Sequence, residues 1–245
     1  MKKPIIIFHT QQLFGYSHLT AVVLLWFILA SKFSVAQQPL TIQFKALFGA
    51  QTLILNDSNY TITKGRVRIE TLKFYISSIQ LLNQNKIVYQ EKLSFHLIDI
   101  SDSSQQSLTL IIPKNTNYTN LKFNLGIDSI TNTSGAMGGD LDPTKGMYWT
   151  WQSGYINFKF EGTSDFSKHP KKEFQYHIGG YQNPFATIQT INLEIFPNKK
   201  LLVGIDTKQA LESIQICSTD HIMSPTLEAV KISKALKQCF KIVKE

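Results

Sequence analysis

Apolar and polar residues alternate repeatedly along the chain after residue 39, and this pattern constrains the fold more than any other feature. In the run 40–48, for example, Ile42 and Phe44 belong to a series of apolar residues at every second position, which is the spacing of one strand face. The phase slips at Ser77-Ser78, which predicts a bulge or bend. Similar runs, rich in β-branched and aromatic residues, predict further strands over 67–82, 93–100, 108–112, 121–127, 173–178, 188–195 and 200–205.

Helical spacing is concentrated near the C-terminus. Ser224 can cap a helix, Pro225 suits its first turn, and apolar residues follow at helical spacing as far as Phe240. A shorter helix is expected over 207–213. Strands in series followed by a late helix predict an all-β protein, an antiparallel β-sandwich with a short C-terminal helical appendage.

The N-terminal segment has the layout of a secretory signal peptide. Lysines follow the first methionine, an apolar run occupies 19–30, and small residues lead to Ala36, where a signal peptidase would cleave. The apolar run has about a dozen residues, fewer than the roughly 20 that a spanning helix needs, so cleavage is favoured over a membrane anchor. We expect a signal peptide at 1–36 and a single domain at 37–245, without a transmembrane segment, in the periplasm, at the cell surface or secreted.

The charge pattern argues against a nucleic-acid partner. The formal net charge is +8, but the basic residues are scattered and nearly all are lysine. Proteins that bind nucleic acid usually carry a basic stripe that contains arginine. We therefore expect no nucleic-acid binding.

The two cysteines, Cys217 and Cys239, predict a disulfide. An even cysteine count in an exported protein usually indicates disulfide pairing, and this bond would tie the C-terminal helix to the loop before it. Metal binding is the alternative, but His221 and Met223 are the only further ligands nearby in the sequence.

The most distinctive stretch is 146–155, which reads Gly-Met-Tyr-Trp-Thr-Trp-Gln-Ser-Gly-Tyr. As a strand, it would place Met147, Trp149 and Trp151 on one face. One interpretation is core packing, the commonest fate of such residues. The other is a metal site in which Met147 supplies a soft sulfur and the tryptophans shape the surroundings, since thioether and imidazole are suitable ligands for Cu(I).

Histidines supply the remaining candidate ligands. His177 ends a predicted strand beside two glycines, where backbone can approach a ligand closely; a hydrogen-bonded structural histidine is the alternative. His221 and Met223 offer another His and Met before the C-terminal helix, or belong to a simple helix-entry loop. His96 is interpreted as structural and His169 as solvated.

Other chemistry has little support in the sequence. There is no nucleotide-binding loop, nucleophile elbow or pair of Cys-x-x-Cys motifs, so we do not expect an enzyme. Asp128, Asp140 and Asp142 lie in a long loop at 128–146. They could bind Ca²⁺, but their spacing does not fit an EF-hand, and we expect them to cap turns.

Three segments together resemble the MbnP-like copper-binding protein family. They are 139–162, with Trp-Thr-Trp after a Gly-Asp-Leu loop, 72–77, and the His-Ile-Gly-Gly sequence at 177–180. The likeness extends over 40–240, nearly the whole predicted mature chain. It implies an extracytoplasmic β-rich domain associated with copper.

In that family some members are partnered by a di-haem peroxidase-like enzyme, which oxidises a tryptophan to kynurenine at or near the copper site. By match of motif, the resemblance implies that Trp149 or Trp151 is the modified residue and that His177 is the best-matching histidine. A related copper protein has a histidine two residues after the modified tryptophan. Here that position after Trp149 is Trp151, so the ligand set must differ.

We therefore expect an exported copper-binding protein that handles Cu(I). His177 is its principal ligand, Met147 and the tryptophans line the site, and His221 and Met223 complete it. The alternative is a non-metal surface or periplasmic interaction module, in which the aromatic strand contacts carbohydrate or peptide. Burial of Trp149 and Trp151 distinguishes the two, because packed rings cannot form a platform.

Overall fold

The computed structural model describes residues 36–58, 60–152, 154–196, 198–214 and 219–244. Residues 37–245 form one compact unit. Except for Ala36, the predicted signal peptide lies outside the described residues, as does Cys217. Within the described residues, no helix has both the length and the apolar character needed to cross a membrane.

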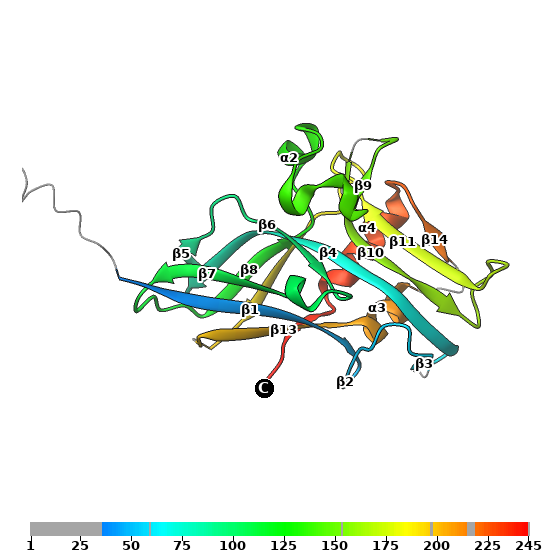
Figure 1. Ribbon diagram of the computed structural model, residues 1–245, viewed down its shortest axis with the longest axis horizontal. Helices are drawn as coiled ribbons and strands as arrows, with labels where there is room; N and C mark the ends of the chain where they lie inside the picture. Colours follow the sequence, from blue (N-terminus) through cyan, green and yellow to red (C-terminus); the bar gives the residue numbers. More distant parts are fainter. Residues whose placement is uncertain (1–35, 59, 153, 197, 215–218, 245) are drawn as a thin grey trace, which may run out of the picture. The chain divides into compact units, whose positions relative to one another are not determined.

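The smaller of two sheets carries the N-terminal strand. Its strands are β1 (Gln37–Phe48), β2 (Gln51–Thr52), β7 (Ser107–Pro113), β13 (Lys200–Asp206) and β15 (Phe240–Ile242). β1 lies beside β13 (Figure 1), and these two strands are parallel although more than 150 residues of chain separate them. β2 and β7 pair antiparallel with β1, and β15 pairs antiparallel with β13.

The larger sheet is built around one long strand. Its strands are β3 (Tyr60–Ile62), β4 (Gly65–Asn83), β5 (Lys86–Gln90), β6 (Phe95–Asp99), β8 (Asn120–Leu125), β9 (Tyr148–Trp149), β10 (Gly154–Ser164), β11 (Glu173–Gly179), β12 (Gln189–Glu194) and β14 (His221–Ile222). Their order is β12-β8-β4-β10-β11-β14, with β3, β5 and β6 also on β4 and β9 on β10. The predicted bulge is confirmed, because the register of β4 against β8 shifts between Ser77 and Gln80 and Ser78 has a φ of 52°.

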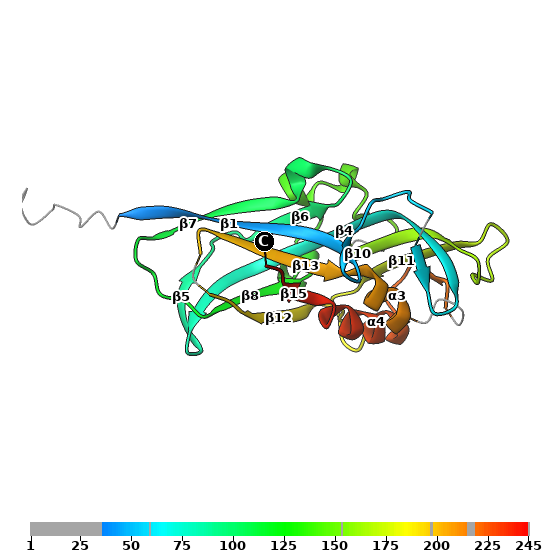
Figure 2. The same ribbon diagram turned by 90° about the horizontal axis from the view of Figure 1, so that it is seen from below.

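The all-β class with a late helix is confirmed. The sheets are mixed, since β1 pairs with β13 and β11 with β14 in parallel. The helices are α2 (Ser129–Thr133), α3 (Thr207–Ile214) and α4 (Leu227–Lys237), and single 3₁₀ turns occupy Ser103–Gln105, Gly139–Leu141 and Pro143–Lys145. α4 packs against α3, β11 and β12 (Figure 2).

The cap of α4 differs from the prediction. Thr226, not Ser224, precedes the first helical residue, and its hydroxyl accepts a hydrogen bond from the Ala229 N–H at 3.1 Å. Thr226 has the extended backbone that a cap residue needs. Pro225 therefore lies before the cap and not in the first turn.

The larger sheet is buried on both faces. The alternation of β4 turns Phe74 toward the smaller sheet, where it packs edge-on to Phe44 of β1. Tyr75 faces the opposite side and belongs to a second apolar cluster with Met147, Trp149 and Tyr155. The long loop that contains α2 covers this second side (Figure 1). We call it the outer face, and the predicted site residues gather there.

Candidate functional site

Charged side chains cross the outer face in register. Lys73 on β4 pairs with Lys159 on β10, which pairs in turn with His177 on β11. Lys73 Nζ lies 2.7 Å from Asp99 Oδ2, and His177 Nε2 lies 2.7 Å from Glu161 Oε1. His177 is buried. Its imidazole is therefore paired with a carboxylate and largely shielded from solvent.

Glu161 is held in its charged form. Burial alone would raise the pKa of this carboxyl, but the hydrogen bond with His177 and the positive charge of Lys159 outweigh burial and lower the pKa. When Glu161 accepts a hydrogen bond from the Nε2–H of a neutral His177, the other ring nitrogen, Nδ1, carries the lone pair that a metal needs.

Trp149 lies on the same face of β11 as His177, and its contact with that strand is at Gly179. Its six-membered ring packs onto Gly179, two positions along the strand, so closely that a Cβ on residue 179 would be 2.7 Å from Trp149 Cζ3. The indole is 6% exposed, and its Nε1 has no hydrogen-bond partner among the described residues. A buried, unsatisfied N–H is costly, so this atom marks a place where another polar group would be accommodated.

Met147 and Trp151 have different surroundings, because the stretch around Trp149 is a hairpin and not one strand. β9 pairs with β10 through Trp149 opposite Gly154. Met147 is fully buried in the same apolar cluster as Trp149. Trp151 lies in the turn and is 66% exposed, with its ring centre 6.0 Å from that of Trp149.

A second cluster of ligand-type side chains lies elsewhere on the larger sheet. One donor atom each from His169, Glu173 and His221 lies within 4.8 Å of the others, and the two imidazole centres are 4.6 Å apart. We call these residues the His-Glu-His cluster. The side chains are 30–32% exposed, so an ion from solvent could reach them.

The four predicted ligands are divided between these places. His221 belongs to the His-Glu-His cluster, Met147 lies in the apolar cluster of Trp149, and His177 lies on β11 two residues before Gly179, on which Trp149 packs. The Cα atoms of Glu173 and His177 are four residues apart on one strand, about 13 Å, so the carboxylate of the His-Glu-His cluster is anchored well away from His177. Met223 follows β14 and is 44% exposed.

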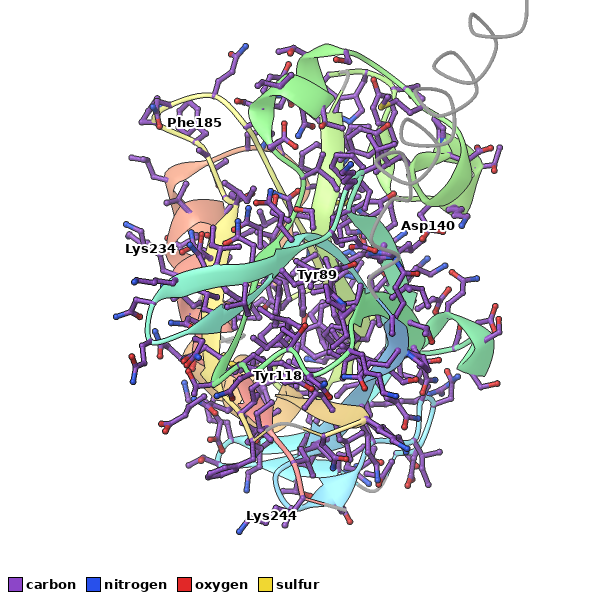
Figure 3. The ribbon with its side chains drawn as sticks, turned by 90° about the vertical axis from the view of Figure 1, so that its left-hand side faces the viewer. Tyr89, Tyr118, Asp140, Phe185, Lys234 and Lys244 are labelled. Carbon is purple, nitrogen blue, oxygen red and sulfur yellow. The ribbon has the colours of Figure 1, made fainter. Side chains whose placement is uncertain are left out.

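Two of the three acidic residues of the covering loop, Asp128 and Asp142, cap turns as expected, and Asp140 does not. Asp128 accepts from the Thr131 N–H at the start of α2, and Asp142 accepts from the Thr144 N–H. Asp140, which is labelled in Figure 3, ties the loop to the sheet, because its Oδ2 accepts from the Leu97 N–H at 3.2 Å. These bonds hold the covering loop against the outer face.

The sequence interpretation missed His169 and Glu173. His169 stands before a proline in a polar stretch, and this context predicts a solvated side chain. In the structure its ring packs on that of His221. His221 lies 52 residues away in the sequence and reaches Glu173 only because β14 pairs in parallel with β11. Local sequence pattern carries no signal for such a pairing.

Comparison with known proteins points to one family. A family model described as MbnP matches residues 37–225. The solved structure of MbnP from Methylosinus trichosporium superimposes with a TM-score of 0.53 at 14% sequence identity, covering 77% of this chain and 80% of that one. At this identity the likeness shows the fold. No curated protein matches the sequence.

Proposed function

Because the chain belongs to the MbnP family, we propose that it is an exported copper-binding protein that handles Cu(I) outside the cytoplasm and is not an enzyme. Membership of this family supports an association with copper. The signal peptide expected at 1–36 supports export, since its apolar run is too short for a membrane anchor.

The observation that carries the proposal is that Trp149 packs on Gly179, two residues along β11 from the carboxylate-bound His177. Imidazole is a suitable copper ligand, and a metal-binding histidine commonly bonds a carboxylate through its other nitrogen, as His177 does with Glu161. The unsatisfied Nε1 of Trp149 fits a site that is completed by a further polar group. Met147 lies in the same apolar cluster as Trp149, and we assign its thioether as the soft sulfur ligand of the site.

We further propose that a di-haem peroxidase-like partner modifies a tryptophan of this hairpin. Conversion to kynurenine is an oxidation in which the partner enzyme uses O₂ or two equivalents of peroxide to cleave the Cγ–Cδ1 bond of the indole. Hydrolysis then releases Cδ1 as formate and leaves an aryl amine and a carbonyl oxygen, both polar. At Trp149 these groups would appear beside His177. Trp151, which is 66% exposed, is the better surface for contact with the partner enzyme.

A Cu(I) competition titration tests the proposal. The full chain, produced with its N-terminal segment so that export takes place, is titrated against a colorimetric chelator under reducing conditions. We expect stoichiometric binding that His177→Ala weakens at least about tenfold. His96→Ala is the matched control, because His96 also bonds a glutamate, Glu91 at 2.8 Å. Equal copper affinity in His177→Ala would remove His177 from the site.

The alternative function is a non-metal interaction module. The exposed Trp151 is the observation that favours it, since a bare aromatic ring can stack on a sugar or a peptide side chain. Trp149 is packed and cannot contribute to such a platform. Loss of glycan or peptide binding in Trp151→Ala, together with no copper binding by the exported protein, would favour this function.

A further inference from the structure

We propose that the His-Glu-His cluster of His169, Glu173 and His221 is a second metal site, which takes a divalent transition ion of the Zn²⁺ type. Three donor atoms already lie within 4.8 Å of one another, close to the separation of ligands around one ion. The proposal does not depend on the copper function, because the cluster shares no residue with the neighbourhood of His177.

Three different segments bring the ligands together. Glu173 is the first residue of β11. His221 opens β14 and stands opposite Gln175, whose N–H donates to the Asp220 carbonyl at 2.8 Å. His169 lies in the turn between β10 and β11, and its Nδ1 is 3.7 Å from Glu173 Oε2. Two ligands therefore sit on paired strands, which favours a preformed site.

Asp220 holds both histidines in place. Its Oδ1 lies 3.2 Å from His221 Nδ1. Its Oδ2 accepts hydrogen bonds at 3.0 Å from the Ser167 hydroxyl and from the N–H groups of Lys168 and His169. One carboxylate thus orients the ring of His221 and fixes the backbone that carries His169.

This arrangement is typical of metal-binding histidines. A carboxylate on one ring nitrogen fixes the tautomer and directs the other nitrogen to the metal, so Nε2 of His221 is the expected donor.

The donor set selects the class of ion. Two imidazoles and one carboxylate are a set that Zn²⁺ uses when one position stays open to water. Cu²⁺ accepts the same donors and generally binds such sites more tightly. The cluster contains no sulfur ligand, which makes it a poor match for Cu(I). The His-Glu-His cluster is thus expected to bind a divalent ion, whereas the site proposed at His177 binds Cu(I).

Isothermal titration of the full chain with Zn²⁺ tests the inference. We expect one binding event that is lost in the double variant His169→Ala/His221→Ala and weakened in Glu173→Gln. Asp220→Asn, a positioning change, should weaken Zn²⁺ binding about 10–100-fold. Competition with Cu²⁺ should displace the Zn²⁺.

Two controls make the result decisive. His177→Ala and His96→Ala should bind Zn²⁺ as the unaltered protein does, and circular dichroism checks that every variant is folded. No Zn²⁺ binding by the unaltered protein, or unchanged binding by a folded double variant, would overturn the proposal. Loss of Zn²⁺ binding in His177→Ala would also overturn it, because the ion would then lie at the other site.

Discussion

The ring of Trp149 occupies the space where a side chain of residue 179 would begin. A Cβ on Gly179 would lie 2.7 Å from both Trp149 Cζ3 and the Tyr155 carbonyl oxygen, closer than packed atoms allow. Glycine at 179 is therefore what permits the indole to rest on the strand, two residues from His177. The position of Trp149 can thus be tested without altering His177 or either tryptophan.

Gly179→Ala should displace Trp149 and destabilise the fold. Overpacking of a well-filled core costs about 1–3 kcal/mol, and urea unfolding followed by tryptophan fluorescence would detect both the loss and the new surroundings of the indole. Gly138→Ala is the matched control, because a Cβ there meets nothing within 4 Å. Equal stability of the two variants would show that Trp149 does not rest on Gly179.

Glu161 predicts a dependence of stability on pH. Its pKa in the folded protein is lowered from the ordinary value of 4.5. The pair with His177 therefore contributes stability above about pH 4.5, and this contribution is lost as the pH falls through the folded pKa.

Glu161→Gln should lower stability at neutral pH by about 1–2 kcal/mol and reduce the loss on acidification. Urea unfolding at neutral and at acidic pH measures both effects. Glu194→Gln, at an exposed position of β12, should leave stability nearly unchanged. A Glu161→Gln variant with an unaltered pH profile would contradict the assignment.

The strands were predictable because their signal is local. Alternation along β4 distinguishes the face of Phe74 from that of Tyr75, and the slip at Ser78 shows the bulge. Each of these features depends on neighbouring residues only. The sequence therefore indicates the class of fold and most of the strands.

Pairings between distant strands were not predictable. Nothing near His221 shows that β14 runs parallel to β11, and so the approach of His169, Glu173 and His221 could not be foreseen. The exposure of Trp151 has a similar cause, because it depends on a turn that interrupts the expected strand. The aromatic motif was found from sequence, but its division into a packed and an exposed ring needed the structure.

Asn157 should prove essential for holding the covering loop. It is buried at a bulge of β10, where its Oδ1 accepts from the Ile127 N–H and its Nδ2 donates to Thr187 Oγ1, both at 2.9 Å. Asn157→Ala would leave the buried Ile127 N–H without its partner and would remove one of the two hydrogen bonds of the Thr187 hydroxyl, at a cost of about 2 kcal/mol or more. Urea unfolding and limited proteolysis of the loop after Ile127 would measure the effect.

The control for Asn157 is Asn192→Ala, at an exposed position of β12, which should change stability by less than about 0.5 kcal/mol. Unchanged protease resistance in Asn157→Ala would mean that other contacts, such as those of Asp140, hold the loop.

The disulfide between Cys217 and Cys239 remains a prediction. Non-reducing peptide mapping of the exported protein should find the two cysteines linked, and reduction should lower stability by about 2–5 kcal/mol. If the two cysteines are not linked, the reactivity of Cys239 should show it. As a thiol, Cys239 has a pKa raised to about 12, chiefly by burial, so it would stay protonated and react with alkylating agents only after unfolding.

The two tryptophans should have separable roles. If Trp149 lies at the copper site, Trp149→Phe should weaken Cu(I) binding about tenfold or more, because it removes the indole that packs on β11 two residues from His177. Trp151→Phe should leave the intrinsic affinity of an already modified protein unchanged, since that ring is exposed in the turn. Peptide mass spectrometry of each variant, isolated from a host with the peroxidase-like partner, would identify the modified residue. Kynurenine at Trp151, with full copper affinity in Trp149→Phe, would reverse the assignment and place the site at the tip of the hairpin.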